Sequence, residues 1–201
     1  MLPQAGRAVA DKVVAVVCAG LESGIAEQVA PFVDGVLLIG EHGDYPRNEL
    51  GQKKYPRYEL FKECVEVFEA DGHCVPIFND KHLSWNWDWA LEMYEDSRRL
   101  GFAFMAGSSL PVTWRTPSID MPGGAPVREA MCVCYGGVDS YDFHGLETLQ
   151  CMVERRAGGE SGVSWLQAYR GESFWQAFHD GIWSRELFEA CLCRSHTLKP
   201  S

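Results

Sequence analysis

The chain has 201 residues, of which 46% are hydrophobic and 12% aromatic, and its formal net charge is −10 at pH 7. This composition provides for a buried core and excludes a disordered chain. The acidic balance argues against nucleic-acid binding, because proteins that bind phosphate backbones carry a basic patch. No run approaches the roughly 18 apolar residues that span a membrane. The first residues, MLPQAGRAVADK, lack the apolar core of a signal peptide. We therefore expect a cytoplasmic protein without nucleic-acid or membrane partners.

The eight cysteines lie mostly inside apolar patterns. Two C-x-C pairs, Cys132/Cys134 and Cys191/Cys193, differ from the C-x2-C spacing that is typical of zinc sites. We predict buried thiols and no metal bound by cysteine.

Apolar runs alternate with helical patterns in the first half of the chain, and this alternation predicts a parallel α/β sheet. In the helical stretch after residue 57, apolar residues recur at helical spacing with charges between them. Ser84 is the expected N-cap of the next helix, and Gly101 is its expected end. The predicted strands are 13–17, 33–40, 75–78 and 102–106, and the predicted helices are 21–32, 58–70 and 85–100.

Polar side chains follow two of the predicted strands. The strand at 75–78 is followed by Asn79-Asp80-Lys81-His82, and the strand at 33–40 by Glu41-His42-Gly43-Asp44. Ligands of open α/β sheets bind outside the carboxyl ends of the strands. The loop that continues to residue 57 is long for a strand-to-helix connection, which is typical of functional loops. We therefore expect a site at this edge of the sheet.

A proline- and glycine-rich stretch, LPVTWRTPSIDMPGGAP, predicts a boundary between two domains. We place the Rossmann-like α/β domain at 1–115 and a smaller α+β domain at 116–201. The predicted strands of the second domain are 127–135 and 163–169, and its predicted helices are 145–155, 172–178 and 184–193.

Three segments, VDGVLLIG, VPIFNDKHLS and GFAFMAGSS, resemble the second half of the nucleotide-binding domain of the Gfo/Idh/MocA oxidoreductases. Asp80-Lys81-His82 stands where that family has Glu-Lys-Pro, so Lys81 matches the active-site lysine of the family. The segment YGGVDSYDFHGLETLQCM resembles a later family segment, in which His144 is the histidine and Glu147 the following acid.

The resemblance implies hydride transfer between NAD or NADP and a sugar or polyol substrate, a role in carbohydrate metabolism, and pairing into a homodimer. No G-x-G-x-x-G follows the first strand, and fewer strand–helix units precede VDGVLLIG than in the family. We therefore expect a Rossmann-like sheet with an incomplete first half. The predicted catalytic residues are Lys81, His144 and Asp80, and the predicted cofactor-binding residues are Gly40, Glu41, His42, Asp44 and His82.

Two alternatives stay open at the level of sequence. The first is a metal-dependent hydrolase or lyase, because carboxylates and imidazoles can ligate a divalent ion. The second is a non-catalytic binding module, in which some of the tryptophans stack on sugar rings. Bound dinucleotide would favour the oxidoreductase, and bound metal would favour the hydrolase or lyase. The residues available for a metal site are Glu41, His42, Asp44, Asp80, His82, His144 and Glu147.

Overall fold

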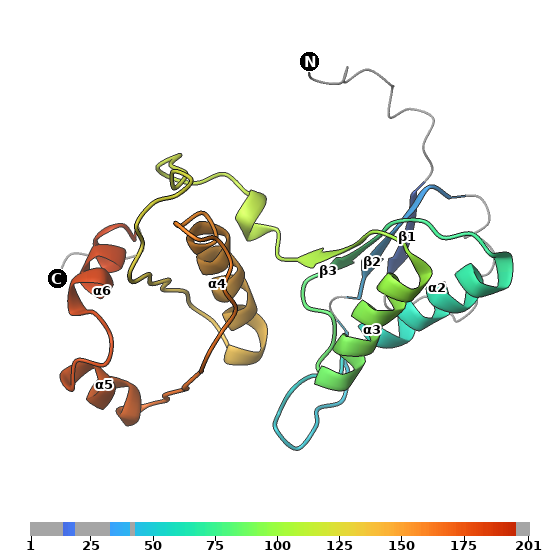
Figure 1. Ribbon diagram of the computed structural model, residues 1–201. Helices are drawn as coiled ribbons and strands as arrows, with labels where there is room; N and C mark the ends of the chain where they lie inside the picture. The colour runs from blue at the N-terminus through green and yellow to red at the C-terminus, as the bar shows by residue number, and fades with distance from the viewer. Residues whose placement is uncertain (1–13, 19–32, 41–42, 196–201) are drawn as a thin grey trace, which may run out of the picture. The chain divides into compact units, whose positions relative to one another are not determined.

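A computed structural model describes residues 14–18, 33–40 and 43–195 of the chain (Figure 1). Its contacts divide the chain into two compact units, Met1–Ser108 (unit 1) and Ser109–Ser201 (unit 2). This division precedes the boundary predicted between residues 115 and 116. The helix predicted at 21–32 lies outside the described residues.

Unit 1 contains a four-stranded parallel sheet with the strand order β1-β2-β3-β4. Each strand pairs with the next strand along the chain, so the predicted parallel α/β architecture is confirmed. The strand order does not reverse within this sheet, whereas a complete Rossmann sheet reverses between its two halves. The described strands are consistent with part of a Rossmann-like sheet. The strands are β1 (Val14–Cys18), β2 (Gly35–Ile39), β3 (Ile77–Asp80) and β4 (Phe104–Gly107).

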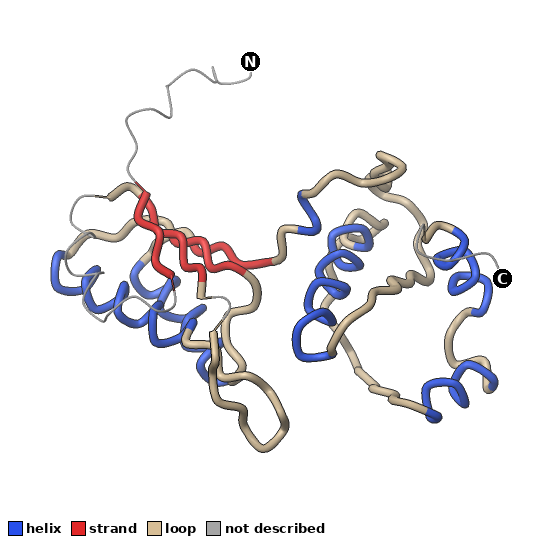
Figure 2. The backbone as a smooth tube through the Cα atoms, turned by 180° about the vertical axis from the view of Figure 1, so that it is seen from behind, coloured by secondary structure: helices blue, strands red, loops and turns tan. Residues whose placement is uncertain are grey.

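Helices α2 (Arg57–Asp71) and α3 (Trp87–Leu100) cover one face of this sheet (Figures 1 and 2). Right-handed crossovers place successive helices on the same face when strands are added in sequence. The predicted apolar stripe of α2 is buried through Phe61, Cys64, Val65 and Phe68. Both predicted helices are therefore confirmed to within two residues at each end.

The start of α3 differs from the prediction in its N-cap. Asn86, not Ser84, is the N-cap, because its side chain accepts a hydrogen bond from the Trp89 amide at 3.2 Å. Ser84 instead accepts from the Asn86 amide at 3.1 Å, one step earlier in the chain. Gly101 ends the helix with φ 76°, as predicted.

The core of unit 1 lies between the sheet and the two helices. The fully buried Phe61 packs its ring 4.9 Å from the ring of Phe104 and 6.1 Å from that of Phe102, measured between centroids. Burial raises the pKa of the neighbouring Cys64 thiol to about 12, which keeps the thiol protonated. The prediction of buried thiols is confirmed for Cys64, whereas Cys134 and Cys193 are exposed.

Charged side chains join α2 to α3 on the outer side of this core. Lys62 Nζ lies 2.6 Å from Asp96 Oδ2 and 2.8 Å from Glu92 Oε1, and Arg99 binds Asp96 on the other side at 2.6 Å. Burial by itself would raise the pKa of Asp96. Hydrogen bonds from Lys62 and Arg99 outweigh this effect and hold the pKa below its usual value of 3.8.

This lowered pKa predicts acid sensitivity. Folded Asp96 binds protons less readily than unfolded Asp96, so its stabilisation is complete above its usual pKa and is lost as the pH falls through the folded value. We expect the free energy of unfolding, measured in urea from about pH 6 to pH 3, to fall less steeply in Asp96→Asn than in the wild type. The neighbouring exposed variant Glu95→Gln should retain the wild-type slope. An Asp96→Asn variant with the full acid dependence would refute this assignment.

Among residues 109–195, unit 2 contains three α-helices, α4 (Val138–Val153), α5 (Glu172–His179) and α6 (Arg185–Cys193), and a short 3-10 helix, η3 (Leu110–Val112). The helices predicted at 172–178 and 184–193 are confirmed. Ser184 caps α6 by accepting a hydrogen bond from the Leu187 amide.

The predicted α+β character of the second domain is wrong for the residues that the structure describes. No strand forms at 127–135 or 163–169, and residues 109–195 contain only an isolated bridge between Ala125 and Arg156. Residues 163–168 are all exposed, so their apolar side chains lack the buried face that holds a strand in a sheet. In addition, α4 begins at Val138 instead of 145, which places His144 within the helix.

Candidate functional site

The candidate site lies at the carboxyl ends of β3 and β4 in unit 1. Lys81 follows β3 directly, and its amide donates to the Gly107 carbonyl at 3.0 Å. The Gly107 amide donates back to the Lys81 carbonyl at 3.1 Å. This reciprocal pair fixes the tip of β3 against the tip of β4.

The backbone of Lys81 adopts the left-handed conformation, with φ 68°. This region is unfavourable for residues with a Cβ atom, by roughly 1–2 kcal/mol. Among the described residues, Lys81 is the one non-glycine residue with a positive φ. The paired tip of β4 therefore holds Lys81 in a strained conformation at the carboxyl ends of the strands.

The structure brings together Lys81 and Asp80, two of the predicted catalytic residues. Lys81 Nζ lies 2.8 Å from Asp80 Oδ2, and the two side chains retain 18% and 21% of their exposure. The pair is thus shielded from bulk water and still accessible to a small molecule. An ion pair of this geometry fixes the direction in which the amine donates.

The strand itself differs from the prediction. β3 spans Ile77–Asp80 instead of 75–78, so Asn79 belongs to the strand and not to its polar tip. Asn79 is fully buried, and its Nδ2 donates to the His82 carbonyl at 3.0 Å. A polar side chain in the buried face of the strand thereby shapes the turn that carries Lys81.

Arg57, the first residue of α2, is the principal site residue that sequence reasoning missed. It is 1% exposed, its guanidinium lies 4.4 Å from the Tyr55 ring centroid, and its Nη1 lies 3.1 Å from His82 Nε2. Because a guanidinium only donates, His82 Nε2 accepts and the ring proton lies on Nδ1. Arg57 therefore fixes the orientation and tautomer of His82 beside Lys81.

Three of the predicted cofactor-binding residues, Gly40, Asp44 and His82, lie in the part of the chain that the structure describes. A Cβ added at Gly40 would lie 3.1 Å from Arg57 Cγ, so this glycine makes room for the arginine. Asp44 is exposed on the long loop, and His82 contacts Arg57. Glu41 and His42 lie outside the described residues.

His144 lies in unit 2 and is half-buried on α4. Its ring packs 6.2 Å from Tyr141 and 5.7 Å from Phe143, measured between centroids. Glu147 follows one turn later, so the two predicted residues share a side of the helix. Lys81 and His144 belong to separate units, and their action in one site stays a prediction.

The described residues were also compared with the requirements of a metal site and of a membrane-spanning helix. Within residues 14–18, 33–40 and 43–195, no three or more His, Cys, Asp or Glu residues are arranged to hold a metal ion. The proposed metal site also drew on Glu41 and His42, outside that part of the chain. None of the described helices combines the length and the apolar character needed to span a membrane.

Comparison with known proteins gave no match to a family model, a curated protein or a solved structure.

Proposed function

We propose that the chain is an oxidoreductase that acts on a hydroxyl or carbonyl group of a sugar or polyol with NAD or NADP, and that Lys81 is its acid–base residue. The observation that carries this proposal is the strained, paired backbone of Lys81 at the carboxyl end of β3. Strained residues persist where surrounding structure holds them, and they cluster at active sites. Lys81 directly follows β3, which lies between β2 and β4 in the sheet. Ligands of such sheets bind outside the carboxyl ends of the strands.

The chemistry available to this site is proton transfer to or from a substrate oxygen. A charged Lys81 donates a hydrogen bond to that oxygen and stabilises the negative charge that develops on it. In the direction of reduction, the Nζ ammonium gives a proton to the substrate oxygen and becomes a neutral amine, and in the direction of oxidation, the neutral Nζ amine takes the hydroxyl proton and becomes an ammonium. Asp80 orients the amine throughout, because its carboxylate lies 2.8 Å from Nζ.

The described residues do not supply a cradle for the dinucleotide. A pyrophosphate approaches backbone amides closely at a glycine-rich turn before a helix. The connection from Lys81 to Asn86, between β3 and α3, contains no glycine, and Gly40 is packed against Arg57. The connection between β1 and β2 lies mainly outside the described residues. We therefore derive no step through the dinucleotide.

Thermal unfolding with NAD, NADP, EDTA and zinc added separately tests this proposal. A ligand at about 100 times its dissociation constant stabilises the folded state by roughly 2.7 kcal/mol, a readily measured shift. We expect stabilisation by NAD or NADP, followed by dinucleotide reduction with a member of a sugar and polyol panel. No stabilisation by either dinucleotide would refute the oxidoreductase. A loss of stability with EDTA that zinc restores would favour the metal-dependent alternative.

A further inference from the structure

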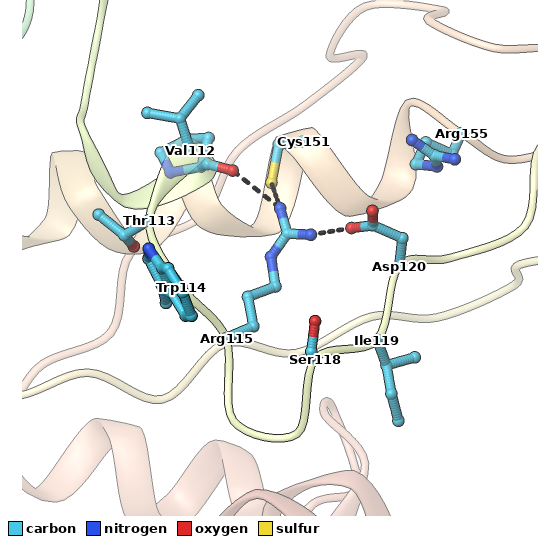
Figure 3. Close-up of a pocket in the computed structure, with 10 residues that line it drawn as sticks. Val112, Thr113, Trp114, Arg115, Ser118, Ile119, Asp120, Cys151 and Arg155 are labelled. Atoms are coloured by element: carbon cyan, nitrogen blue, oxygen red, sulfur yellow. Dashed lines mark hydrogen bonds and ion pairs between the residues drawn. The ribbon is translucent and has the colours of Figure 1, made fainter.

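Unit 2 contains a pocket of about 510 Å³ between the segment that follows η3 and helix α4 (Figure 3). The polar and aromatic side chains that line it lie on both elements. They include Trp114, Arg115, Ser118, Asp120, Cys151 and Arg155. This pocket is built from unit 2 alone, so its role is independent of the function proposed for Lys81.

Arg115 is held rigidly in the wall of the pocket. Its Nη2 donates to the Pro111 carbonyl at 2.8 Å and to Cys151 Sγ at 3.8 Å, and its Nη1 forms an ion pair with Asp120 (Figure 3). Three anchors from three positions remove most of the rotamer freedom of this long side chain. The charge of Asp120 balances that of Arg115.

Arg155, in the turn that follows α4, adds a second guanidinium to the same pocket. Its Nε donates to the Met121 carbonyl, which ties the side chain to the segment opposite. Within the part of the chain that the structure describes, Arg155 forms no ion pair with a carboxylate. With Arg115 balanced by Asp120, the charged lining of the pocket carries a net charge of +1 in a chain of net charge −10.

We propose that this pocket binds a small ligand that carries a single oxyanion group, a carboxylate or a phosphate. A guanidinium offers parallel N–H donors that match the oxygens of either group, and Arg155 supplies the charge that is not balanced. The Ser118 hydroxyl adds a further donor in the lining. Trp114 is fully exposed at the pocket, so its ring offers a flat face to the remainder of the ligand.

Isothermal titration of the full chain tests this proposal with three probes: D-glucuronate, D-glucose and inorganic phosphate. We expect saturable binding of glucuronate, phosphate or both that Arg155→Gln weakens, and no binding of glucose that depends on Arg155, because glucose lacks the charge. Binding of glucuronate alone identifies a carboxylate site, and binding of phosphate alone identifies a phosphate site. Absence of saturable binding of both anions up to about 10 mM, or glucose binding that Arg155→Gln weakens equally, would overturn the proposal.

Variants of the lining separate this pocket from general electrostatic attraction. Arg155→Gln should weaken anion binding about tenfold or more, because it removes a charge-assisted hydrogen bond. Asp120→Asn should strengthen it about threefold, because a repelling charge is lost while the amide oxygen can still accept from Arg115. The matched control Arg128→Gln removes an exposed arginine of the same unit outside the pocket and should leave affinity unchanged.

A further variant tests the aromatic wall without endangering the fold, because Trp114 is fully exposed. Where glucuronate binds, Trp114→Ala should weaken it about threefold to tenfold through loss of ring stacking, and it should leave phosphate binding unchanged. Equal effects of Arg155→Gln and Arg128→Gln on affinity would show that the pocket does not hold the anion, and would also overturn the proposal.

Discussion

Replacing Phe61 with alanine is expected to lower the free energy of unfolding of unit 1 by about 3–5 kcal/mol. Phe61 is fully buried on the inner face of α2, and its ring contacts the rings of Phe102 and Phe104. Truncation would remove the apolar contacts of the ring and leave a cavity between the helix and the sheet. Because the free energy of unfolding of a small domain is about 5–15 kcal/mol in total, this single change would remove a large part of it.

Urea unfolding of the full chain measures this loss, and hydrogen exchange at the amides of β2, β3 and β4 assigns it to unit 1. The matched control is Leu50→Ala on the long loop, where the side chain is 84% exposed. That change should alter stability by no more than about 0.5 kcal/mol. A loss of less than about 1 kcal/mol in Phe61→Ala would show that the helices do not pack on the sheet as described.

The elements of unit 1 could be predicted because local and periodic signals agree there. The apolar stripe of α2 follows the helical period, and a glycine with positive φ ends each of the two helices, at Gly72 and Gly101. The strands β2, β3 and β4 each contain apolar residues next to one another in the sequence, and β3 pairs in parallel with β2 and with β4. Every level of description then points to the same structure, which is the condition under which sequence specifies fold.

Asp80, Lys81 and His82 were visible in the sequence as a polar tip after a strand, whereas Arg57 and its contact with His82 depended on tertiary packing. Lys81 and Asp80 are adjacent in the chain, so a polar tip after a strand was sufficient to find them. Arg57 and His82 are 25 residues apart and meet only because α2 begins beside the turn after β3. The signal that could have indicated Arg57 is a charged residue at the first position of a helix that follows a long loop.

The strands predicted at 127–135 and 163–169 do not form, because an apolar segment needs a neighbouring strand to pair with. A strand becomes stable through pairing and through burial of one face. The segment at 127–135 meets α4 instead: a Cβ added at Gly145 would lie 2.9 Å from Cys134 Sγ. The pair Cys132/Cys134 therefore lies close to helix α4. The spacing of these two cysteines does not indicate that the segment pairs with another strand.

Replacing Lys81 with alanine or glycine is expected to lower turnover strongly, and the glycine replacement is also expected to relieve strain in the backbone. Lys81→Ala and Lys81→Gly both remove the amine, so each should lower turnover about 10²- to 10⁴-fold, the usual contribution of an acid–base group. The two variants differ only in the Cβ atom. At φ 68° glycine avoids the clash, and after its larger loss of chain entropy we expect Lys81→Gly to be about 0.5–1 kcal/mol more stable than Lys81→Ala.

Steady-state kinetics and urea unfolding of the wild type, Lys81→Ala and Lys81→Gly distinguish a catalytic lysine from a structural one. Lys81→Arg adds a further distinction, because arginine keeps the positive charge beside Asp80 but does not give up its proton. Proton transfer by Lys81 requires that Lys81→Arg be nearly as inactive as Lys81→Ala. Turnover retained in Lys81→Arg would reduce the role of the amine to electrostatic stabilisation. A loss of several kcal/mol of stability in Lys81→Ala would instead make Lys81 a structural partner of Asp80. Relief of backbone strain would raise the stability, so it could not explain such a loss.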